Sequence, residues 1–478
     1  MKFPLLAKLL TVGCAAAVVL LVQAAPEVPP GQRGQRRASA QDLTPCFHTD
    51  VPAHPLDLIL GRPTATSVAV SALSYASDEA YLEWGTQPGV FPNRTATVKL
   101  PAGEPVEITL GPLTADTAYV YRLQTRKDAG VFVAGDQYHF HTARPPNSPF
   151  TFTIQADSHL DERTDTALYT NTLRNALADA PDFHIDLGDT FMGEKVRALG
   201  EPIAPMYLAQ RYYFGLLCPS APLFFVTGNH DGEISNNDPE AVALRRKYVP
   251  GPLPNGFYSG NETDPQGNYY AWTWGDALFI VLDPFTYTTD RIGTTDDNWN
   301  RTLGETQYRW LQRTLESSHA ALKFVFIHHL VGGLDKNGRG GAEAAPYFEW
   351  GGRSLDGSEQ FAARRPGWGL PIHQLLVKHG VSIVFHGHDH FYARQELDGI
   401  VYQECPQPGW VGGERVNQAA DYGYRSGQIM ASSGHLRVQV AAENVTVSYV
   451  RSYLRTDQTV GHQNGETGDR YVLPAHHY

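Results

Sequence analysis

The stretch Pro222-Leu-Phe-Phe-Val-Thr-Gly228-Asn229-His230-Asp231 changes from apolar to polar within a single turn. Its apolar residues stop at a glycine, and three side chains that can bind a metal ion or a proton follow directly. A continuous apolar run bounded by turn residues is typical of a strand covered on both faces, as in a parallel α/β sheet. Because such sheets gather their binding groups at the carboxyl ends of the strands, the stretch predicts a buried strand that leads into a reactive turn.

Four other stretches repeat this arrangement of an apolar run followed by polar side chains. They are Phe150–Ala156 before Asp157-Ser158-His159, Phe183–Leu187 before Gly188-Asp189, Leu322–Ile327 before His328-His329, and Val381–Phe385 before His386-Gly387-His388-Asp389-His390. Five strands that each end in His, Asp or Asn favour one shared polar site over five unrelated ones.

The chain is long enough for two domains, with 478 residues of which 42% are hydrophobic. Short alternating runs between Leu56 and Thr142 predict a small antiparallel sandwich over residues 45–143. A proline-rich linker begins at Ala143, and strands alternate with helices after it, so residues 144–478 are expected to form the catalytic domain.

Three segments of the second domain have the apolar spacing of helices, namely Glu162–Ala180, Ile203–Leu217 and Glu305–Ser318. Two adjacent runs, Tyr269–Trp274 and Ala277–Asp283, break the alternation and predict a second sheet or an antiparallel extension of the first. The polar tail from Thr456 onward ends in His476-His477-Tyr478, which is either a weak metal-binding tract or a frayed terminus.

The N-terminal segment predicts export. Lys2 and Lys8 precede or flank the apolar run Leu9–Val22, which small residues follow, so residues 1–24 are interpreted as a secretory signal peptide. A membrane anchor is the alternative, but the run is short for ~30 Å of hydrocarbon. Residues 25–44 lack aromatic residues and predict a flexible leader. We therefore expect a secreted protein, extracellular or periplasmic, without stable membrane insertion.

Charge and cysteine content exclude other classes of partner and site. Lys and Arg number 38 against 50 for Asp and Glu, and the net charge of −12 includes no basic stripe, so no nucleic acid polymer is expected as a partner. Cys46, Cys218 and Cys405 remain once the signal peptide is removed, which allows at most one intramolecular disulfide. They are too far apart in sequence to resemble a zinc site.

The polar residues at the strand ends form a set of oxygen and nitrogen donors without thiolates. The candidate ligands are Asp157, His159, Asp189, Asn229, one of His328 and His329, His388 and His390. Such donors suit Fe, Mn or Zn. Seven donors exceed the need of one ion, so the set predicts a two-metal site in which Asp189 bridges the ions.

The five motifs in this order resemble the signature of the calcineurin-like metallophosphoesterases. The strand-rich flanks look more narrowly like purple acid phosphatases and their bacterial relatives, and Leu113–Leu123 resembles the corner of a fibronectin type III domain. The resemblance implies a four-layer α-β-β-α sandwich preceded by a small all-β, fibronectin III-like sandwich.

The resemblance also implies how the site residues divide. One ion would be held by Asp157, His159, Asp189 and His390, and the other by Asp189, Asn229, His328 and His388. His328 is preferred to His329 because residues alternate faces along a strand. His230 would stay outside both coordination spheres as a catalytic group at the phosphoryl group or the leaving group.

Two positions depart from the purple enzymes. Those enzymes have glycine where this chain has His159, and an iron-bound tyrosine where it has Met192. The purple charge-transfer colour is therefore not expected.

The favoured function is a secreted binuclear-metal phosphoesterase that acts on a small phosphorylated substrate, preferably a monoester, by attack of a metal-bridging hydroxide. A phosphodiesterase or nucleotidase of the same superfamily is one alternative. A non-catalytic adhesion protein with a vestigial metal site is another. Lys336 or Arg339, in the glycine-rich loop Val331–Gly352, could hold a phosphate oxygen or be solvated charges.

Overall fold

The structure is a computed structural model, and it describes residues 44–76, 78–232, 238–262, 267–289, 293–294, 297–410 and 414–475. The predicted signal peptide, the predicted leader up to residue 43 and the histidines at the C-terminus lie outside these residues. Thr44–Tyr478 form one unit by their internal contacts, so the division near residue 143 stays a prediction. Among the described residues, no helix is both long and apolar enough to cross a membrane.

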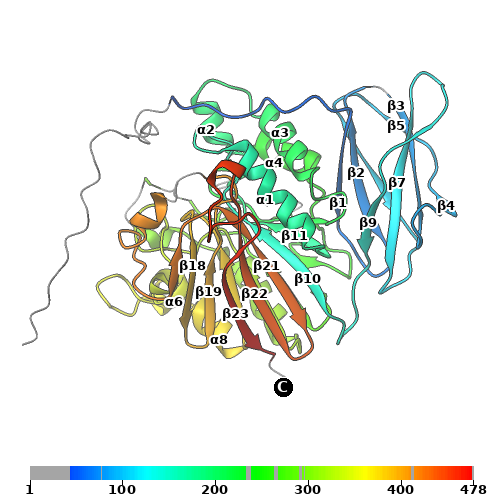
Figure 1. The fold of residues 1–478 in the computed structure, drawn as a ribbon. Coiled ribbons are helices and arrows are strands. Elements are labelled where there is room, and N and C mark those ends of the chain that lie inside the picture. The colour runs from blue at the N-terminus through cyan, green and yellow to red at the C-terminus, as the bar shows by residue number, and fades with distance from the viewer. Residues whose placement is uncertain are drawn as a thin grey trace, which may run out of the picture. The chain divides into compact units, whose positions relative to one another are not determined.

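The N-terminal part of the described chain is all-β and consists of two antiparallel sheets, as expected (Figure 1). The first contains β1 (Leu56–Gly61), β2 (Val68–Ser74) and β6 (Pro105–Leu110). The second contains β3 (Asp78–Gly85), β4 (Asn93–Arg94), β5 (Val98–Leu100), β7 (Ala118–Arg126), β8 (Val133–Ala134) and β9 (Tyr138–His141). Alternate residues of β7, including Tyr119, Tyr121 and Leu123, are buried in the core between the sheets. The likeness to fibronectin III domains remains a prediction.

Two larger sheets form the centre of the rest of the chain. The six-stranded sheet has the order β12 (Leu223–Phe225), β11 (Phe183–Asp186), β10 (Phe150–Gln155), β21 (Gly434–Ala441), β22 (Asn444–Arg451) and β23 (Thr467–Pro474). Its first three strands are parallel to one another, and the last three pair antiparallel.

The eight-stranded sheet carries the remaining strands. Its order is β13 (Ser259–Gly260), β14 (Tyr270–Trp274), β15 (Ala277–Val281), β16 (Leu322–Phe326), β17 (Ile383–His386), β19 (Ile400–Glu404), β18 (Tyr392–Leu397) and β20 (Gln428–Met430). The strands β15, β16, β17 and β19 are parallel. The run Tyr269–Trp274 thus belongs to a second sheet, which was one of the two arrangements expected.

Helices cover the outer face of each sheet (Figure 1). The six-stranded sheet is covered by α1 (Thr166–Ala178), α2 (Gly193–Ala198), α3 (Ala204–Phe214) and α4 (Pro239–Tyr248). The eight-stranded sheet is covered by α5 (Gly304–Glu316), α6 (Phe348–Gly351), α7 (Phe361–Arg364) and α8 (Ile372–Lys378). Short 3-10 helices are Asn298–Asn300, Ala342–Ala344, Glu414–Gln418 and Arg455–Asp457.

An aromatic core fills the space between the two large sheets. Phe152 of the first sheet packs on Phe279 and Phe324 of the second, with ring centroids 5.2 and 5.8 Å apart. Alternate residues of the same strands, such as Leu278 and Val325, face the helices instead. This period-2 alternation in two stacked sheets gives the expected α-β-β-α order of layers.

Arg211 joins the all-β region to the helices of the larger region. Its guanidinium is buried and donates to the hydroxyl and the carbonyl oxygen of Ser71, each at 3.1 Å, and to the carbonyl oxygen of Tyr248. A buried charge of this kind persists only where several acceptors satisfy it. The all-β region is therefore attached through specific polar contacts.

Two predictions made from the sequence differ from the structure. The predicted helix from Glu162 begins only at Thr166, because the Asp165 carboxylate accepts hydrogen bonds from Ala167 and Leu168 and caps it there. The segment described as a polar tail contains β23, whose Tyr471 and Leu473 pack on the core while the alternate residues Arg470 and Val472 face outward. Its alternating pattern is that of an edge strand.

Candidate active site

The predicted site residues lie in turns at the carboxyl ends of strands from both large sheets. The turns after β10, β11 and β12 carry Asp157, His159, Asp189, Asn229 and His230, and the turns after β16 and β17 carry His328, His388 and His390. All of these side chains are buried except His230, which is partly exposed. The structure thus brings together every site residue that the sequence predicts.

Most of these turns place ligand-capable residues in the left-handed backbone region. The φ angles of Asp157, His159, Asp189, His388 and His390 are 59°, 47°, 54°, 82° and 68°. Residues with a side chain adopt this conformation at a cost and do so mainly at functional sites. The turns therefore hold strain in order to aim these side chains at one place.

Glycines allow the turns to approach closely. A Cβ atom at Gly387 would lie 2.7 Å from Oδ2 of Asp157. Gly188 and Gly228 face one another so closely that a Cβ on either would overlap the backbone of the other turn. These three glycines are thus required for turn-to-turn packing.

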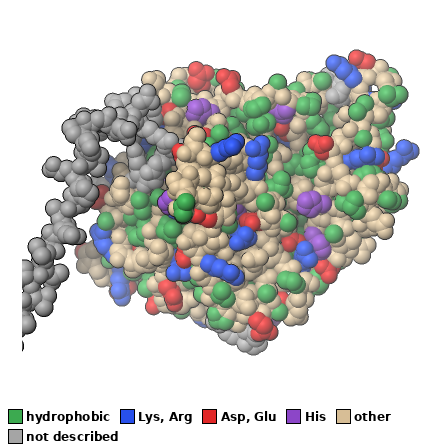
Figure 2. Space-filling view, in the orientation of Figure 1, with side chains coloured by type: hydrophobic (Ala, Val, Ile, Leu, Met, Phe, Trp, Pro, Cys, Tyr) green, Lys and Arg blue, Asp and Glu red, His purple; other side chains and the backbone are tan. Residues whose placement is uncertain are grey.

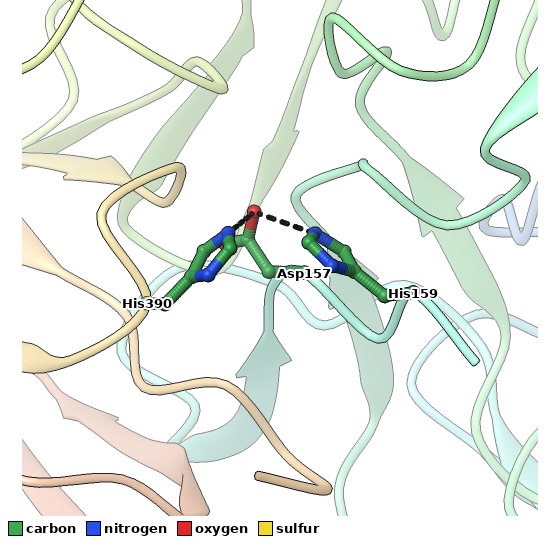
Figure 3. A group of neighbouring side chains, drawn as sticks. All are labelled: Asp157, His159 and His390. Carbon is green, nitrogen blue, oxygen red and sulfur yellow. Dashed lines mark ion pairs between the residues drawn. The ribbon is translucent and has the colours of Figure 1, made fainter. Parts of the chain in front are cut away.

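One group that could hold an ion consists of Asp157, His159 and His390. Figure 3 shows the Asp157 carboxylate between the two imidazole rings. Its Oδ1 atom lies 3.4 Å from Nε2 of His390 and 3.7 Å from Nε2 of His159. The Nδ1 atom of His159 faces Asp161 at 3.2 Å, which directs Nε2 inward.

A second group consists of Asp189, His328 and His388, with Asn229 beside it. The Nε2 atom of His328 is 3.3 Å from Oδ2 of Asp189 and 3.1 Å from Oδ1 of Asn229. Nδ1 of His328 donates to the Leu187 carbonyl oxygen at 2.8 Å. Nε2 of His388 donates to a carbonyl oxygen in the 331–341 loop, which leaves its Nδ1 for the group.

Asp189 stands between the two groups. Its Oδ2 atom is 3.3 Å from Nε2 of His328, in the second group, and 3.9 Å from Nε2 of His159, in the first. The same oxygen lies 4.0 Å from Nε2 of His230. One carboxylate oxygen is thus faced by histidines of both groups, which is the position of a ligand that two ions share.

The donors fit divalent or trivalent ions. Oδ1 of Asp157 and Nε2 of His159 are buried and have no hydrogen-bond partner. Buried polar atoms nearly always form hydrogen bonds. Two possible ligand atoms that face each other without a hydrogen bond are therefore expected where a cation binds. His159, His328 and His388 also each use one ring nitrogen for a hydrogen bond, as metal-binding histidines do.

The pKa values of the site residues in the metal-free chain also indicate that the carboxylates need positive charge beside them. Burial alone lowers the pKa of His328 and His159, but Asp189 beside the first, and Asp157 with Asp161 beside the second, raise the two values to about 10 and about 9. Burial opposes ionisation of Asp189 also, yet the surrounding histidines hold its pKa well below the usual range. Protons on the histidines therefore supply the positive charge that bound ions would supply.

A family model described as calcineurin-like phosphoesterase matches residues 150–392, just over half of the chain. The chain belongs to this family. The matched segment begins at β10 and ends just after His390, so it contains all eight predicted site residues.

Solved structures agree with this fold. PhoD is 16% identical, with a TM-score of 0.63, and the match covers 90% of this chain and 92% of PhoD. A purple acid phosphatase, PPD1 from yellow lupin (Lupinus luteus) seeds, is 14% identical, with a TM-score of 0.59 and coverage of 88% and 74%. No curated protein matches the chain. The likeness of this phosphoesterase to both structures extends over the N-terminal all-β region, since each match covers most of the chain.

The phosphoesterase has a small polar cavity beside the two groups. Its volume is about 200 Å³, and its lining consists of His159, Asp161, Glu162, Arg163, Asp189, Lys195, His230, Arg339, His388 and His390. A larger groove of about 1450 Å³ runs along β14 and α5, and none of the candidate site residues lines it. The small cavity is the better candidate for the reaction, because only it contains the chemical groups.

Asp231 ties two of the turns together. Its carboxylate accepts hydrogen bonds of 2.7 to 3.1 Å from the backbone N–H groups of Gly228, Asp189, Thr190 and Phe191. The sequence left open whether this residue orients a neighbour or caps the turn. The contacts are those of a cap that also fixes Asp189.

Arg339 is held in place and is not a solvated charge. It donates to Oδ1 of Asp389 at 2.9 Å and to the carbonyl oxygen of His388 at 3.3 Å, and it lies 4.1 Å over the Tyr422 ring. Asp389 also accepts hydrogen bonds from Gly340 and Tyr424. Lys336, the other residue singled out in the loop, does not line the cavity.

Sequence reasoning missed the acidic partners of the site. Asp161 holds His159, Glu194 is hydrogen-bonded to His230, and Glu404 pairs with His386 at 2.6 Å. Asp161 could have been found from its place two residues after His159. Glu194 and Glu404 carry no such local signal.

Several other residues considered in the sequence analysis do not belong to the two ligand groups. His329 has its Nδ1 2.9 Å from the Leu330 carbonyl oxygen and does not belong to either group. Met192 is fully buried among the apolar residues outside the six-stranded sheet. Cys46, Cys218 and Cys405 are all free thiols, so the possible disulfide is not formed in this structure.

Proposed function

We propose that the protein is a secreted phosphoesterase that uses two metal ions to hydrolyse small phosphate esters, with monoesters preferred. The observation that carries this proposal is the position of Asp189 Oδ2 between histidines of two ligand groups. Two ions ~3.5–4 Å apart polarise phosphoryl oxygens and activate water. Fe, Mn and Zn all suit the donors.

The residues of the chain would divide the work. Asp157, His159 and His390 would hold one ion, Asn229, His328 and His388 would hold the other, and Asp189 would contribute to both sites. His230 is partly exposed at the same cavity and remains outside the two groups. Its Nε2 would donate a hydrogen bond to the phosphoryl group or a proton to the leaving oxygen.

The preference for monoesters rests on charge. Arg163, Lys195 and Arg339 all line a cavity of about 200 Å³. Asp161, Glu162 and Asp189 share this lining, so the cations would favour a doubly charged monoester over a singly charged diester only together with the positive charge of two bound ions. Charges of both signs are mixed on the surface of the face drawn in Figure 2.

A panel of nitrophenyl substrates tests the proposal. The protein is loaded with Mn, Zn or Fe and assayed on 4-nitrophenyl phosphate and bis(4-nitrophenyl) phosphate. We expect higher kcat/KM for the monoester and loss of activity after metal removal. Asp136→Asn, an exposed carboxylate of the all-β region, is the control for Asp189→Asn.

The outcomes separate the alternatives. Higher kcat/KM for the diester would replace the monoesterase by a phosphodiesterase. Absence of turnover with any of the metals, in protein shown to bind two ions, would favour a non-catalytic protein.

A further inference from the structure

The cavity beside the metal-ligand groups is lined, within the described part of the chain, only by ionisable side chains. All ten of its lining residues are His, Asp, Glu, Lys or Arg. Ligand sites usually combine a few polar groups with apolar and aromatic walls. A base, an aromatic ring or an acyl chain finds no such wall here. The cavity instead matches a small, polar and charged molecule.

Three cations reach this cavity from three different segments. Arg163 lies in the loop before α1, Lys195 lies on α2, and Arg339 lies in the 331–341 loop. Two of them face carboxylates, since Arg339 pairs with Asp389 at 2.9 Å and Arg163 lies 3.6 Å from Glu162. These two charges are partly neutralised within the protein.

Lys195 differs from the other two. It is exposed, and it makes no hydrogen bond or ion pair with any residue that the structure describes. Its neighbour in sequence, Glu194, holds the His230 ring. The ammonium group of Lys195, which has no partner among the described residues, therefore lines the same cavity as His230 and is close enough to His159 to act on its charge.

This position relates Lys195 to the leaving group. If His230 protonates the leaving oxygen, the leaving group lies in the cavity that both side chains line, and Lys195 is available there to bind a charged group attached to it. A fixed positive charge at the edge of a polar cavity attracts an anion and selects against neutral analogues.

We propose that the substrate is a phosphate monoester whose leaving group carries a second anionic group, a carboxylate or another phosphate, and that Lys195 binds this second group. Arg163 lines the same cavity and adds to the attraction. The inference rests on the proposed function, because it takes the leaving group to lie in the cavity that His230 and Lys195 line.

Binding of non-hydrolysable phosphonates tests the proposal without relying on turnover. Propylphosphonate, 3-phosphonopropionate and ethane-1,2-bisphosphonate differ only in whether a methyl, a carboxylate or a phosphonate ends the chain. Affinity for the metal-loaded protein is measured by calorimetry, and metal content is checked after each titration. We expect the two charged ligands to bind about fivefold to tenfold more tightly than propylphosphonate.

Substitution of Lys195 should remove this preference. In Lys195→Gln the difference should fall below about twofold, while the Kd of propylphosphonate stays the same. Lys195→Glu should reverse the preference, and Lys195→Arg should keep it. Arg197→Gln is the matched control, because Arg197 lies two positions on in α2 and pairs with Asp238 and Glu240 away from the cavity.

Each outcome decides one point. Preference for only one charged ligand assigns the second anion as a carboxylate or a phosphate. No preference in the wild-type protein, or a preference that survives in Lys195→Gln, would overturn the proposal. Hydrolysis of glycerol 3-phosphate and 3-phosphoglycerate is measured in parallel. If both esters are hydrolysed but the charged phosphonates bind no more tightly than propylphosphonate, the proposed phosphoesterase activity is supported and the role of Lys195 is wrong. If the charged phosphonates bind more tightly but neither ester is hydrolysed, the role of Lys195 is supported and the proposed activity is wrong.

Discussion

The Nδ1 atom of His230 is hydrogen-bonded to Oε1 of Glu194, the acidic residue in the first turn of α2. The carboxylate accepts a hydrogen bond from the Nδ1–H group and so fixes the tautomer and the direction of the ring. Nε2 is left facing Asp189 Oδ2 at 4.0 Å and the cavity. His230 is thus held with its Nε2 atom toward the cavity, as the proposed proton transfer requires.

His230→Ala should lower kcat by about 10²–10⁴-fold and leave the metal content intact. The loss should be smaller for nitrophenyl phosphate than for an alkyl phosphate, because a good leaving group needs little protonation. Kinetics on both substrates and metal analysis of the same sample check this. Equal losses would indicate electrostatic stabilisation, and loss of an ion would show that the role of His230 is assigned wrongly.

Glu194→Gln should lower kcat about tenfold or more, since a neutral amide no longer fixes the tautomer of His230. The double variant with His230→Ala should be no slower than His230→Ala alone, because both changes remove the same function. Glu201→Gln, an exposed acidic residue just after α2, is the control and should be neutral. Additive losses in the double variant would mean that Glu194 acts independently of His230.

Asp189→Asn should lose far more activity than Asp136→Asn, because the altered oxygen faces histidines of both ligand groups. Metal analysis should show fewer than two ions per chain. An Asp189→Asn variant that still binds two ions and has near-native turnover would contradict the bridging role of Asp189.

The iron-loaded protein should not be purple. Met192 stands where purple enzymes carry their iron-bound tyrosine, and its side chain is fully buried in an apolar cluster. A visible spectrum of the iron-loaded protein checks this. A strong tyrosinate-to-iron band would show that another tyrosine has taken the role.

Metal binding should release protons. Asp189, and Asp157 with Asp161, overcome the effect of burial and raise the pKa values of His328 and His159 to about 10 and about 9, so both rings are protonated at pH 7 in the metal-free chain. These protons must leave before an ion binds, so affinity should rise with pH by up to about tenfold per unit for each proton released. Titration with Mn between pH 6 and 8, in buffers of different ionisation enthalpy, measures the release. Affinity that is independent of pH would contradict the assignment of these histidines.

The sequence by itself determined the chemical identity of the site. An apolar run and the polar residues that follow it are neighbours in the chain, so the ends of five strands and the donors beyond them could be located without coordinates. His328 could be distinguished from His329 by the alternation of faces along a strand. The layers followed from the alternation of strands and helices and from the resemblance to a known family.

The division of the donors into two groups followed from the family resemblance and not from their spacing, and only the tertiary structure brought the members of each group together and supplied the partners that orient them. Asp157 meets His390, which lies 233 positions further along the chain, and Glu194 meets His230 from a separate helix, so no local spacing encodes either contact. The same holds for Arg339, which the sequence could not distinguish from Lys336 and which packing against Asp389 and Tyr422 fixes at the cavity. Periodicity reports the environment of a residue along its own strand or helix, whereas a pair of side chains is set by how the two sheets stack and how their turns approach.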